Sequence, residues 1–237
     1  MKKAYFTLFL LTTTLIFQAT AQVIYVNHAA TGMSTGTNWE NAYIGLQDAL
    51  MNANTRNEIW VAAGTYLPGG TPEATFAINT NLVLLGGFDG TESSAADRDP
   101  EENPTILSGD LNGDDIEGNF NVFRNDNAMS VVTANDSVQV VIDGFTISHG
   151  HAPTMDPDER GRGGGIHSKL DFGGSLVVRN CLFTHNFAGR QGGGMFAQNF
   201  EAGGEQPFVI ENTLFQSNRS GSLGGGIYIS QWGTTPP

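Results

Sequence analysis

This chain of 237 residues has little cysteine and few basic residues. Cys181 is the single cysteine, so no disulfide can form within the chain. Its position between two strand-like residues predicts a packed thiol rather than a nucleophile. Lysine and arginine number 11 against 24 acidic residues, which gives a formal net charge of −13. This charge disfavours nucleic acid and anionic membrane surfaces as partners.

Long apolar runs are also missing after the N-terminal segment, so no transmembrane span is expected there. The N-terminus itself has the pattern of a secretory signal peptide. A basic start, Lys2-Lys3, precedes an apolar stretch over residues 4–17, and an Ala-x-Ala cleavage site ends at Ala21. We expect residues 1–21 to be removed and the chain to be exported to the extracellular space, the cell surface or the outer membrane.

Residues 22–57 are expected to form an N-terminal strand and a helix. The segment Val23 to Val26 alternates as a strand does. From Trp39 to Asn54, apolar residues recur at spacings of three and four, which predicts an amphipathic helix. In a stack of strands, such a helix would close the N-terminal end of the core.

The last third of the chain contains one motif three times, in which an apolar residue, two variable residues and Gly or Asn precede a glycine triplet. The three copies are Ile147–Gly150 with Gly163–Gly165, Phe183–Asn186 with Gly192–Gly194, and Phe215–Asn218 with Gly224–Gly226. The second and third copies lie 32 positions apart without a gap. A fixed period in segments rich in Val, Ile, Phe and Gly predicts a solenoid of short strands, assigned here to residues 58–237.

Alignment of the copies predicts which side chains stack in neighbouring turns of the chain. The expected inward ladders are Val140/Leu176/Phe208, Ile142/Val178/Ile210 and Ile147/Phe183/Phe215. Two further columns contain only Gly and Asn, namely Gly144/Asn180/Asn212 and Gly150/Asn186/Asn218. Because Gly and Asn tolerate positive φ, each column predicts a sharp left-handed corner.

The paired Phe-x-x-Asn and Gly-Gly-apolar motifs resemble the repeat of the polymorphic outer-membrane proteins. Residues 23–230 as a whole resemble bacterial secreted proteins with right-handed parallel β-helix repeats, of the pectate-lyase-like superfamily. The resemblance implies an all-β fold, a single-stranded right-handed parallel β-helix (solenoid) with a short N-terminal α-helical cap. The superfamily includes lyases, hydrolases, adhesins and autotransporter passengers, so the chemistry stays open. No capping segment follows the third glycine strand, so we expect truncation at the C-terminal end.

A charged column is expected on the outer surface, where Asp143, Arg179 and Glu211 align. The resemblance to pectate lyases offers Arg179 as the base of a polysaccharide lyase. We favour the alternative, a charge ladder that stabilises strand stacking by roughly 0.2 to 1 kcal/mol per pair. The chain lacks the cluster of several acids around one basic residue that those lyases carry.

The loop inserted in the first motif copy holds three acidic residues, Asp156, Asp158 and Glu159. Glycoside hydrolysis needs two carboxylates facing each other across a cleft, and these are the nearest candidates. A run of acids in a loop is more often only solvated, and we favour that interpretation.

Two columns of rings are candidate binding surfaces. His149 and His185 align, so they are candidates for a Zn²⁺ site or for acid-base chemistry, or form a surface histidine pair, which we favour. His167, Phe196 and Tyr228 follow the glycine triplets and form either an exposed ladder suited to the apolar faces of sugars or rings packed under a loop.

An acidic stretch offers a candidate calcium site. Asp110, Asn112 and Asp114 place oxygen atoms at alternate positions, as the start of a calcium loop does. The pattern then fails, because Asp115 replaces the glycine of the turn and Asn121 replaces the bidentate glutamate. Ca²⁺ is therefore the alternative here, and a solvated acidic turn is the favoured interpretation.

These patterns favour a secreted or cell-surface scaffold of adhesin type, which binds polysaccharide or cell-surface glycan. The alternative is an exported carbohydrate-active enzyme, either a polysaccharide lyase or a glycoside hydrolase. A third hypothesis is a purely structural spacer. A groove that combined an acid cluster with a basic residue would favour the enzyme, and the sequence contains no clear example.

Overall fold

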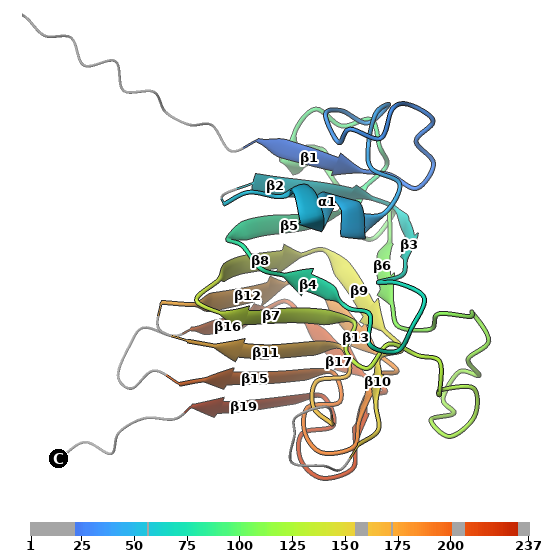
Figure 1. Cartoon of the computed structure of the whole chain (residues 1–237), viewed down its shortest axis with the longest axis vertical. Coiled ribbons are helices and arrows are strands. Elements are labelled where there is room, and N and C mark those ends of the chain that lie inside the picture. The colour runs from blue at the N-terminus through green and yellow to red at the C-terminus, as the bar shows by residue number, and fades with distance from the viewer. Residues whose placement is uncertain (1–21, 56, 155–160, 172, 201–206, 232–237) are drawn as a thin grey trace, which may run out of the picture.

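The computed structural model describes residues 22–55, 57–154, 161–171, 173–200 and 207–231. This part of the chain is mostly β-strand, with parallel sheets and little helix (Figure 1). The expected signal peptide at residues 1–21 lies outside the described residues. Within the described ranges, no helix combines the length and the apolar character needed to cross a membrane.

The described strands form four sheets, here named A to D. Sheet A contains β1 (Val23–Val26), β2 (Asn57–Ala62), β5 (Leu82–Phe88), β8 (Gln139–Asp143), β12 (Ser175–Arg179) and β16 (Phe208–Glu211). Sheet B contains β3 (Gly64–Tyr66), β6 (Thr105–Ser108), β9 (Phe145–Ser148), β13 (Leu182–Thr184) and β17 (Leu214–Gln216). Sheet C contains β4 (Phe76–Ile78), β7 (Val132–Asp136), β11 (Ile166–Leu170), β15 (Met195–Asn199) and β19 (Ile227–Gln231). Sheet D contains β10 (His151–Ala152), β14 (Phe187–Ala188) and β18 (Arg219–Ser220).

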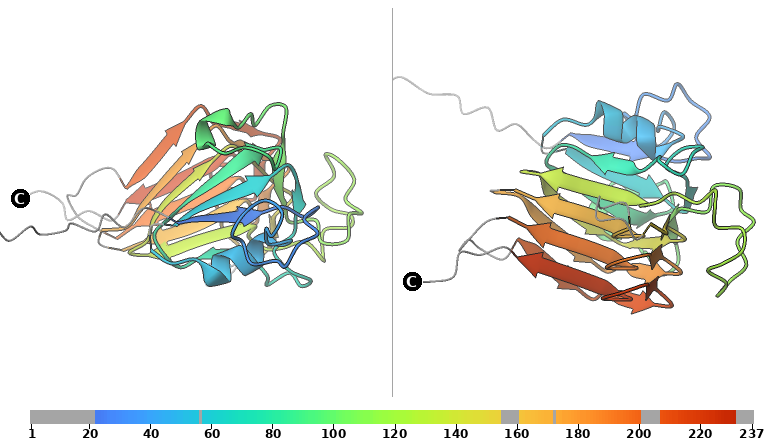
Figure 2. Two further views of the ribbon diagram at one scale, coloured as in Figure 1. Left: turned by 90° about the horizontal axis from the view of Figure 1, so that it is seen from above. Right: turned by 60° about the horizontal axis from the view of Figure 1, so that its bottom comes forward.

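From β2 onward the chain visits sheets A, B and C in turn, and the last three passages add a strand of sheet D between B and C. Each passage is called a coil below. All strands pair in parallel with the strands of adjacent coils. The coils follow one another along the long axis of the molecule, and the view from above shows the sheets arranged around a common interior (Figure 2).

The stacking register predicted from the repeats is confirmed. Leu176 of β12 lies between Val140 and Phe208, and Phe183 of β13 lies between Ile147 and Phe215. The rings of Phe183 and Phe215 stack with centroids 4.6 Å apart and planes 15° apart. Such a pair is worth roughly 0.5 to 1.5 kcal/mol beyond its burial. The ladder through Phe183 continues along sheet B to Leu107 and Tyr66, so the core contains a column of apolar side chains.

The first predicted corner is confirmed. Gly144, Asn180 and Asn212 have φ values of 83°, 52° and 43°, so all three are left-handed. Each ends a strand of sheet A and turns the chain into sheet B. Gly and Asn adopt this backbone conformation more readily than other residues, which explains the column.

The second predicted corner is wrong by one position. The left-handed residues are His149, His185 and Ser217, with φ values of 63°, 55° and 52°. Asn186 and Asn218, for which we predicted this conformation, do not have positive φ. Their side chains point into the stack instead, and hydrogen bonding rather than backbone freedom accounts for these asparagines.

The inward asparagines form a ladder of hydrogen bonds. Asn186 is fully buried, and its Oδ1 accepts from the amide of Gly150 at 2.9 Å. Its Nδ2 donates to the carbonyl of Ile147 at 2.9 Å and to Oδ1 of Asn218 at 3.0 Å. Asn218 in turn donates to the carbonyl of Phe183 at 2.8 Å. The ladder thus satisfies backbone groups that the corner leaves without strand partners.

The glycine triplets follow from close backbone approach. The first glycine of each triplet, such as Gly192 with a φ of 68°, is left-handed. The later glycines lie against the next coil, and a Cβ atom on Gly194 would come within 2.5 Å of the carbonyl oxygen of Gly226. No side chain fits there without a shift of the backbone, because real Cβ atoms keep larger distances.

The predicted helix over residues 39–54 is shorter than expected, since α1 spans only Leu46–Asn52. The amide of Tyr43 donates instead to the carbonyl of Tyr25 in β1 at 2.9 Å, which holds residue 43 in a bridge to that strand. Leu46 and Ala49 of α1 are buried in the core, where the helix packs against β1 and β4 (Figure 1).

Candidate functional site

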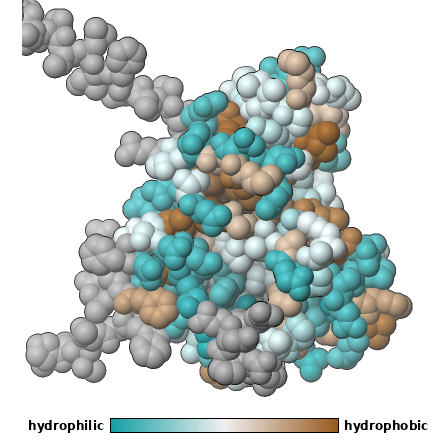
Figure 3. Space-filling view, in the orientation of Figure 1, coloured by the Kyte–Doolittle hydropathy of each residue, from teal (hydrophilic) through white to brown (hydrophobic). Residues whose placement is uncertain are grey.

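The face of the molecule in Figure 3 is largely hydrophilic. On the face in Figure 3, hydrophobic residues form small separate groups among hydrophilic ones. Candidate sites are the places where accessible rings, charges and amides meet.

One such site is a hollow of about 390 Å³ on the outer face of sheet C. It is lined by Asn135, Asp136, His167, Lys169, Asp171 and Phe200. Strand alternation turns Ser168 of β11 inward and its two neighbours outward into this hollow. Nζ of Lys169 lies 5.2 Å from the ring centroid of Phe200, which is 45% exposed. An accessible ring, an ammonium group and two carboxylates therefore share one concave surface.

The predicted ring column adjoins this hollow. The rings of His167 and Phe196 stack with centroids 5.3 Å apart, and those of Phe196 and Tyr228 stack at 5.9 Å. Phe196 is only 1% exposed: it stacks between His167 and Tyr228, and the guanidinium of Arg162 lies 5.0 Å from its ring centroid. For the central ring, the structure therefore favours the packed arrangement over the exposed ladder. Sugar binding by this column stays a prediction.

His149 and His185 stack in neighbouring coils, with centroids 5.5 Å apart and planes 13° apart. Burial lowers the pKa of His149 to about 4, and the charge of Arg124 acts in the same direction. Nδ1 of His185 lies 2.9 Å from Oγ1 of Thr184. Oε1 of Glu117 lies 3.9 Å from Nε2 of His185. Among the described residues, however, the two imidazoles belong to no group of three ligand atoms that all lie within 4.8 Å of one another. The zinc hypothesis gains no support from this arrangement.

The charged column differs from the outward ladder that we predicted, because the side chain of Asp143 is only 1% exposed. Its Oδ2 lies 2.7 Å from Arg98 Nη2 and 2.7 Å from Arg179 Nε, and its Oδ1 accepts from Asn180 at 2.8 Å. Burial alone would raise the pKa of Asp143, but these hydrogen bonds hold it below its ordinary value. Arg98 comes from residues 89–104, whose position over the column could not be read from the repeats.

Arg179, the candidate base of a lyase, is thus held by Asp143 in a fixed ion pair. This contact fits a structural charge ladder. Glu211 of β16 is in register with Arg179 of β12, as such a ladder requires. The hydrolase candidates Asp156, Asp158 and Glu159 lie outside the described residues.

A larger groove of about 820 Å³ follows the first corner. Its polar lining includes Arg98, Asp99, Glu101, Thr146, Asn180 and Asn212. The buried thiol of Cys181 lies on the same side, and burial raises its pKa to about 12, as expected for a packed cysteine. The groove offers amide and carboxylate groups along the direction in which the coils stack.

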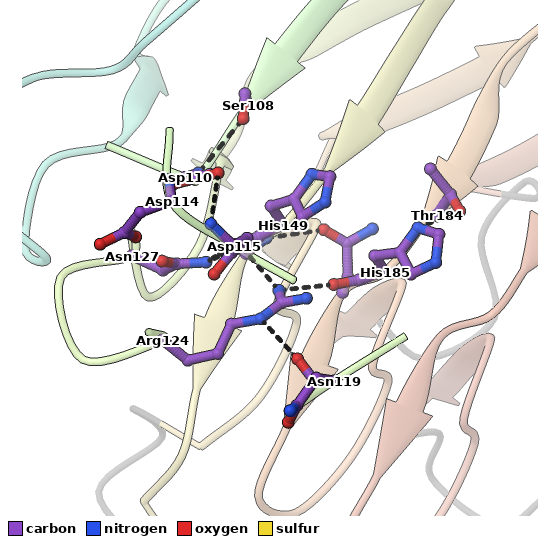
Figure 4. A network of polar contacts seen from close by, with 12 residues as sticks. Ser108, Asp110, Asp114, Asp115, Asn119, Arg124, Asn127, His149, Thr184 and His185 are labelled. Carbon is purple, nitrogen blue, oxygen red and sulfur yellow. Dashed lines mark hydrogen bonds and ion pairs between the residues drawn. The ribbon is translucent and has the colours of Figure 1, made fainter. Parts of the chain in front are cut away.

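The predicted calcium loop lies between β6 and β7, in an excursion of residues 109–130 (Figure 4). Oδ1 of Asp110 accepts from the amides of Gly113 and Asp114, at 2.8 and 3.2 Å. Asn112 is exposed. Carboxylate oxygens of Asp110, Asp114 and Asp126 lie within 4.8 Å of one another. Two of the three predicted ligands therefore meet an acid that the sequence pattern did not identify.

A buried polar network fastens this excursion to the coils. Nη1 of Arg124 lies 3.1 Å from Oδ2 of Asp115, and each side chain is 1% exposed. Arg124 also donates to the carbonyl of His185 at 3.1 Å, while Asn127 donates to Asp115 at 2.8 Å and to the carbonyl of His149 at 2.7 Å. Burial raises the pKa of Asp115 to about 6, against the lowering effects of Asn127 and Arg124.

The segment from the corner residue Asn212 to β19 contains the third copy of the repeated motif. Residues 212–230 match the Chlamydia polymorphic membrane protein (Chlamydia_PMP) repeat. The match supports the resemblance to polymorphic outer-membrane proteins and indicates a bacterial surface or outer-membrane protein. Comparison with curated proteins and with solved structures gave no match.

The motif repeated from coil to coil accounts for the stacked columns, but not for the residues that meet around them. Sequence analysis missed Arg98, Asp126, Asn127 and Phe200, which reach the sites from loops and strand ends. These residues are not repeated between coils, so no period reveals their neighbours. The one available signal was the concentration of Asn and Asp at residues 119–127.

Proposed function

We propose that this chain is an exported scaffold, built as a single right-handed parallel β-helix, that binds polysaccharide or cell-surface glycan at the bacterial surface. Parallel pairing of every coil with the next supports a helical path of the chain. Crossovers between parallel strands are almost always right-handed, which supports that hand. The match of residues 212–230 to the polymorphic membrane protein repeat supports a surface location.

The hollow on the outer face of sheet C carries the binding proposal. Its volume of about 390 Å³ is in the range of small-ligand sites. The exposed ring of Phe200 suits the apolar face of a sugar. The carboxylates of Asp136 and Asp171 are hydrogen-bond acceptors for sugar hydroxyls. Together these groups provide the ring and the polar partners that glycan recognition requires.

A panel of neutral and acidic polysaccharides, tested by affinity electrophoresis and calorimetry, checks this proposal. We expect Phe200→Ala to weaken binding by roughly two- to tenfold, which corresponds to the loss of one ring contact. Leu214→Ala is the matched control, because Leu214 is 57% exposed but lies on sheet B. Failure of every polysaccharide to bind, or equal loss in both variants, would contradict glycan binding in the hollow.

The same mixtures of the protein with each polysaccharide test the enzymatic alternative. The ion pair between Arg179 and Asp143 favours a scaffold, because a base for proton abstraction must be released from such a partner. New unsaturated or reducing ends would overturn the scaffold proposal. A Glu101→Ala variant reports on the larger groove, and loss of binding there alone would move the site from sheet C to the first corner.

A further inference from the structure

The excursion of residues 109–130 brings three carboxylates together from two separate stretches. Asp110 and Asp114 belong to its first turn, whereas Asp126 returns from its far end. Their ligand oxygens lie within 4.8 Å of one another. Two oxygens that bind one Ca²⁺ at 2.3 to 2.6 Å are at most about 5 Å apart. The separation therefore fits a single ion between the three groups.

A second observation is independent of this acidic cluster. Asn127 is 1% exposed, and its Oδ1 is buried without a hydrogen-bond partner. Its Nδ2 is directed to Asp115 and to the carbonyl of His149, so Oδ1 faces the other way, on the side of Asp114 in Figure 4. Buried oxygens of Asp115 and Asp126 are also unpartnered. Buried acceptors of this kind are costly, and a cation satisfies them.

The charge balance also favours a divalent cation. Arg124 pairs with Asp115, and its charge also acts on Asp110. One guanidinium cannot balance the carboxylates of Asp110, Asp114, Asp115 and Asp126, so negative charge remains to be neutralised. Carboxylate and amide oxygens are ligands of hard cations, and three carboxylates around one ion suit Ca²⁺ better than Mg²⁺, which keeps most of its water.

We propose a Ca²⁺ site at the base of the excursion, with ligands from Asp110, Asp114, Asp126 and Asn127. The ion joins the first turn of the excursion to its last residues. Because Asn127 also bonds to the carbonyl of His149, Ca²⁺ fixes the loop on the second corner of the coils. The site goes beyond the glycan-binding proposal and uses other residues, so either can fail without the other.

Calorimetric titration of the chelator-treated chain with CaCl₂ tests the site directly. We expect one Ca²⁺ per chain, with a dissociation constant on the order of 10⁻⁴ to 10⁻³ M or tighter. Amide hydrogen exchange should slow across residues 110–127 when Ca²⁺ is added. No binding in this range, or an equal response to Mg²⁺, overturns the proposal.

Matched variants separate coordination from general charge effects. Asp126→Asn removes one ligand charge and should weaken Ca²⁺ binding about tenfold or more. Asp97→Asn changes the net charge equally at an exposed position of the η1 turn (Ala95–Asp97), and it should bind as the unmodified chain does. Circular dichroism confirms that each variant is folded. Unchanged affinity in folded Asp126→Asn refutes the assigned ligands.

Discussion

The asparagine ladder allows a sharp test of how the coils are held together. Asn186→Ala removes the side chain that bridges three coils while leaving the strand register unchanged. It deprives the Gly150 amide of its acceptor at 2.9 Å and the Ile147 carbonyl of its donor at 2.9 Å. Because Asn186 is fully buried, solvent does not readily replace either bond.

The magnitude follows from these two lost partners. A buried polar group left unsatisfied costs about 1 to 3 kcal/mol, so we expect Asn186→Ala to lower the free energy of unfolding by roughly 2 to 6 kcal/mol. Asn218→Ala is the matched control, because Asn218 is itself partly exposed, so water can enter the space that its side chain leaves. There we expect a loss of only about 0.5 to 1.5 kcal/mol.

Urea unfolding followed by far-ultraviolet circular dichroism measures both variants, and hydrogen exchange at the Gly150 amide reports the local effect. Protection of that amide should fall in Asn186→Ala and stay near the unmodified level in Asn218→Ala. An Asn186→Ala variant within about 1 kcal/mol of the unmodified chain would refute the ladder as a source of stability. Equal losses in the two variants would refute the role of burial.

Gly194→Ala should cost about 1 to 3 kcal/mol, because its Cβ would meet the Gly226 carbonyl at 2.5 Å. Gly226→Ala, whose nearest neighbour would be 3.1 Å away, should cost less in thermal unfolding, and the reverse order would contradict the explanation of the triplets. Asp143→Ala should cost about 3 to 5 kcal/mol by urea unfolding, because it leaves the largely buried guanidinium of Arg98 and the side-chain amide of Asn180 without their carboxylate partner. Arg179→Ala should cost less, since that side chain is 44% exposed, and equal losses would count against the burial argument. The lowered pKa of Asp143 means that its contribution is present above about pH 4 and is lost as the pH falls through that lowered pKa, which unfolding at several pH values checks.

The register of the stack could be predicted because parallel coils place residues at equivalent positions of the repeat in contact. The ladders through Leu176 and Phe183 and the first corner at Asn180 follow from that rule alone. The second corner could not be assigned correctly, since Asn serves both left-handed backbone and inward hydrogen bonding. Only the structure distinguishes the outward turn residue His185 from the inward ladder residue Asn186.

Residues in the loops have no equivalent positions in neighbouring coils, so the sites in the loops were predicted only in part. The calcium pattern found Asp110 and Asp114, but Asp126 and Asn127 join them through a chain reversal that no local spacing encodes. Burial of Asp143 was missed for the same reason, because Arg98 reaches it from a segment without repeats. The shortened helix reflects a backbone pairing of Tyr43 that side-chain periodicity does not report.

The parallel register also allows the number of coils, and with it the length of the stack, to change. Phe208 occupies the same place in its coil as Leu176, which lies 32 residues earlier. Loss or duplication of one whole period would join identical environments and leave every remaining neighbour matched. The stack can therefore become longer or shorter in evolution by duplication or loss of whole coils, without changes to the residues of its core.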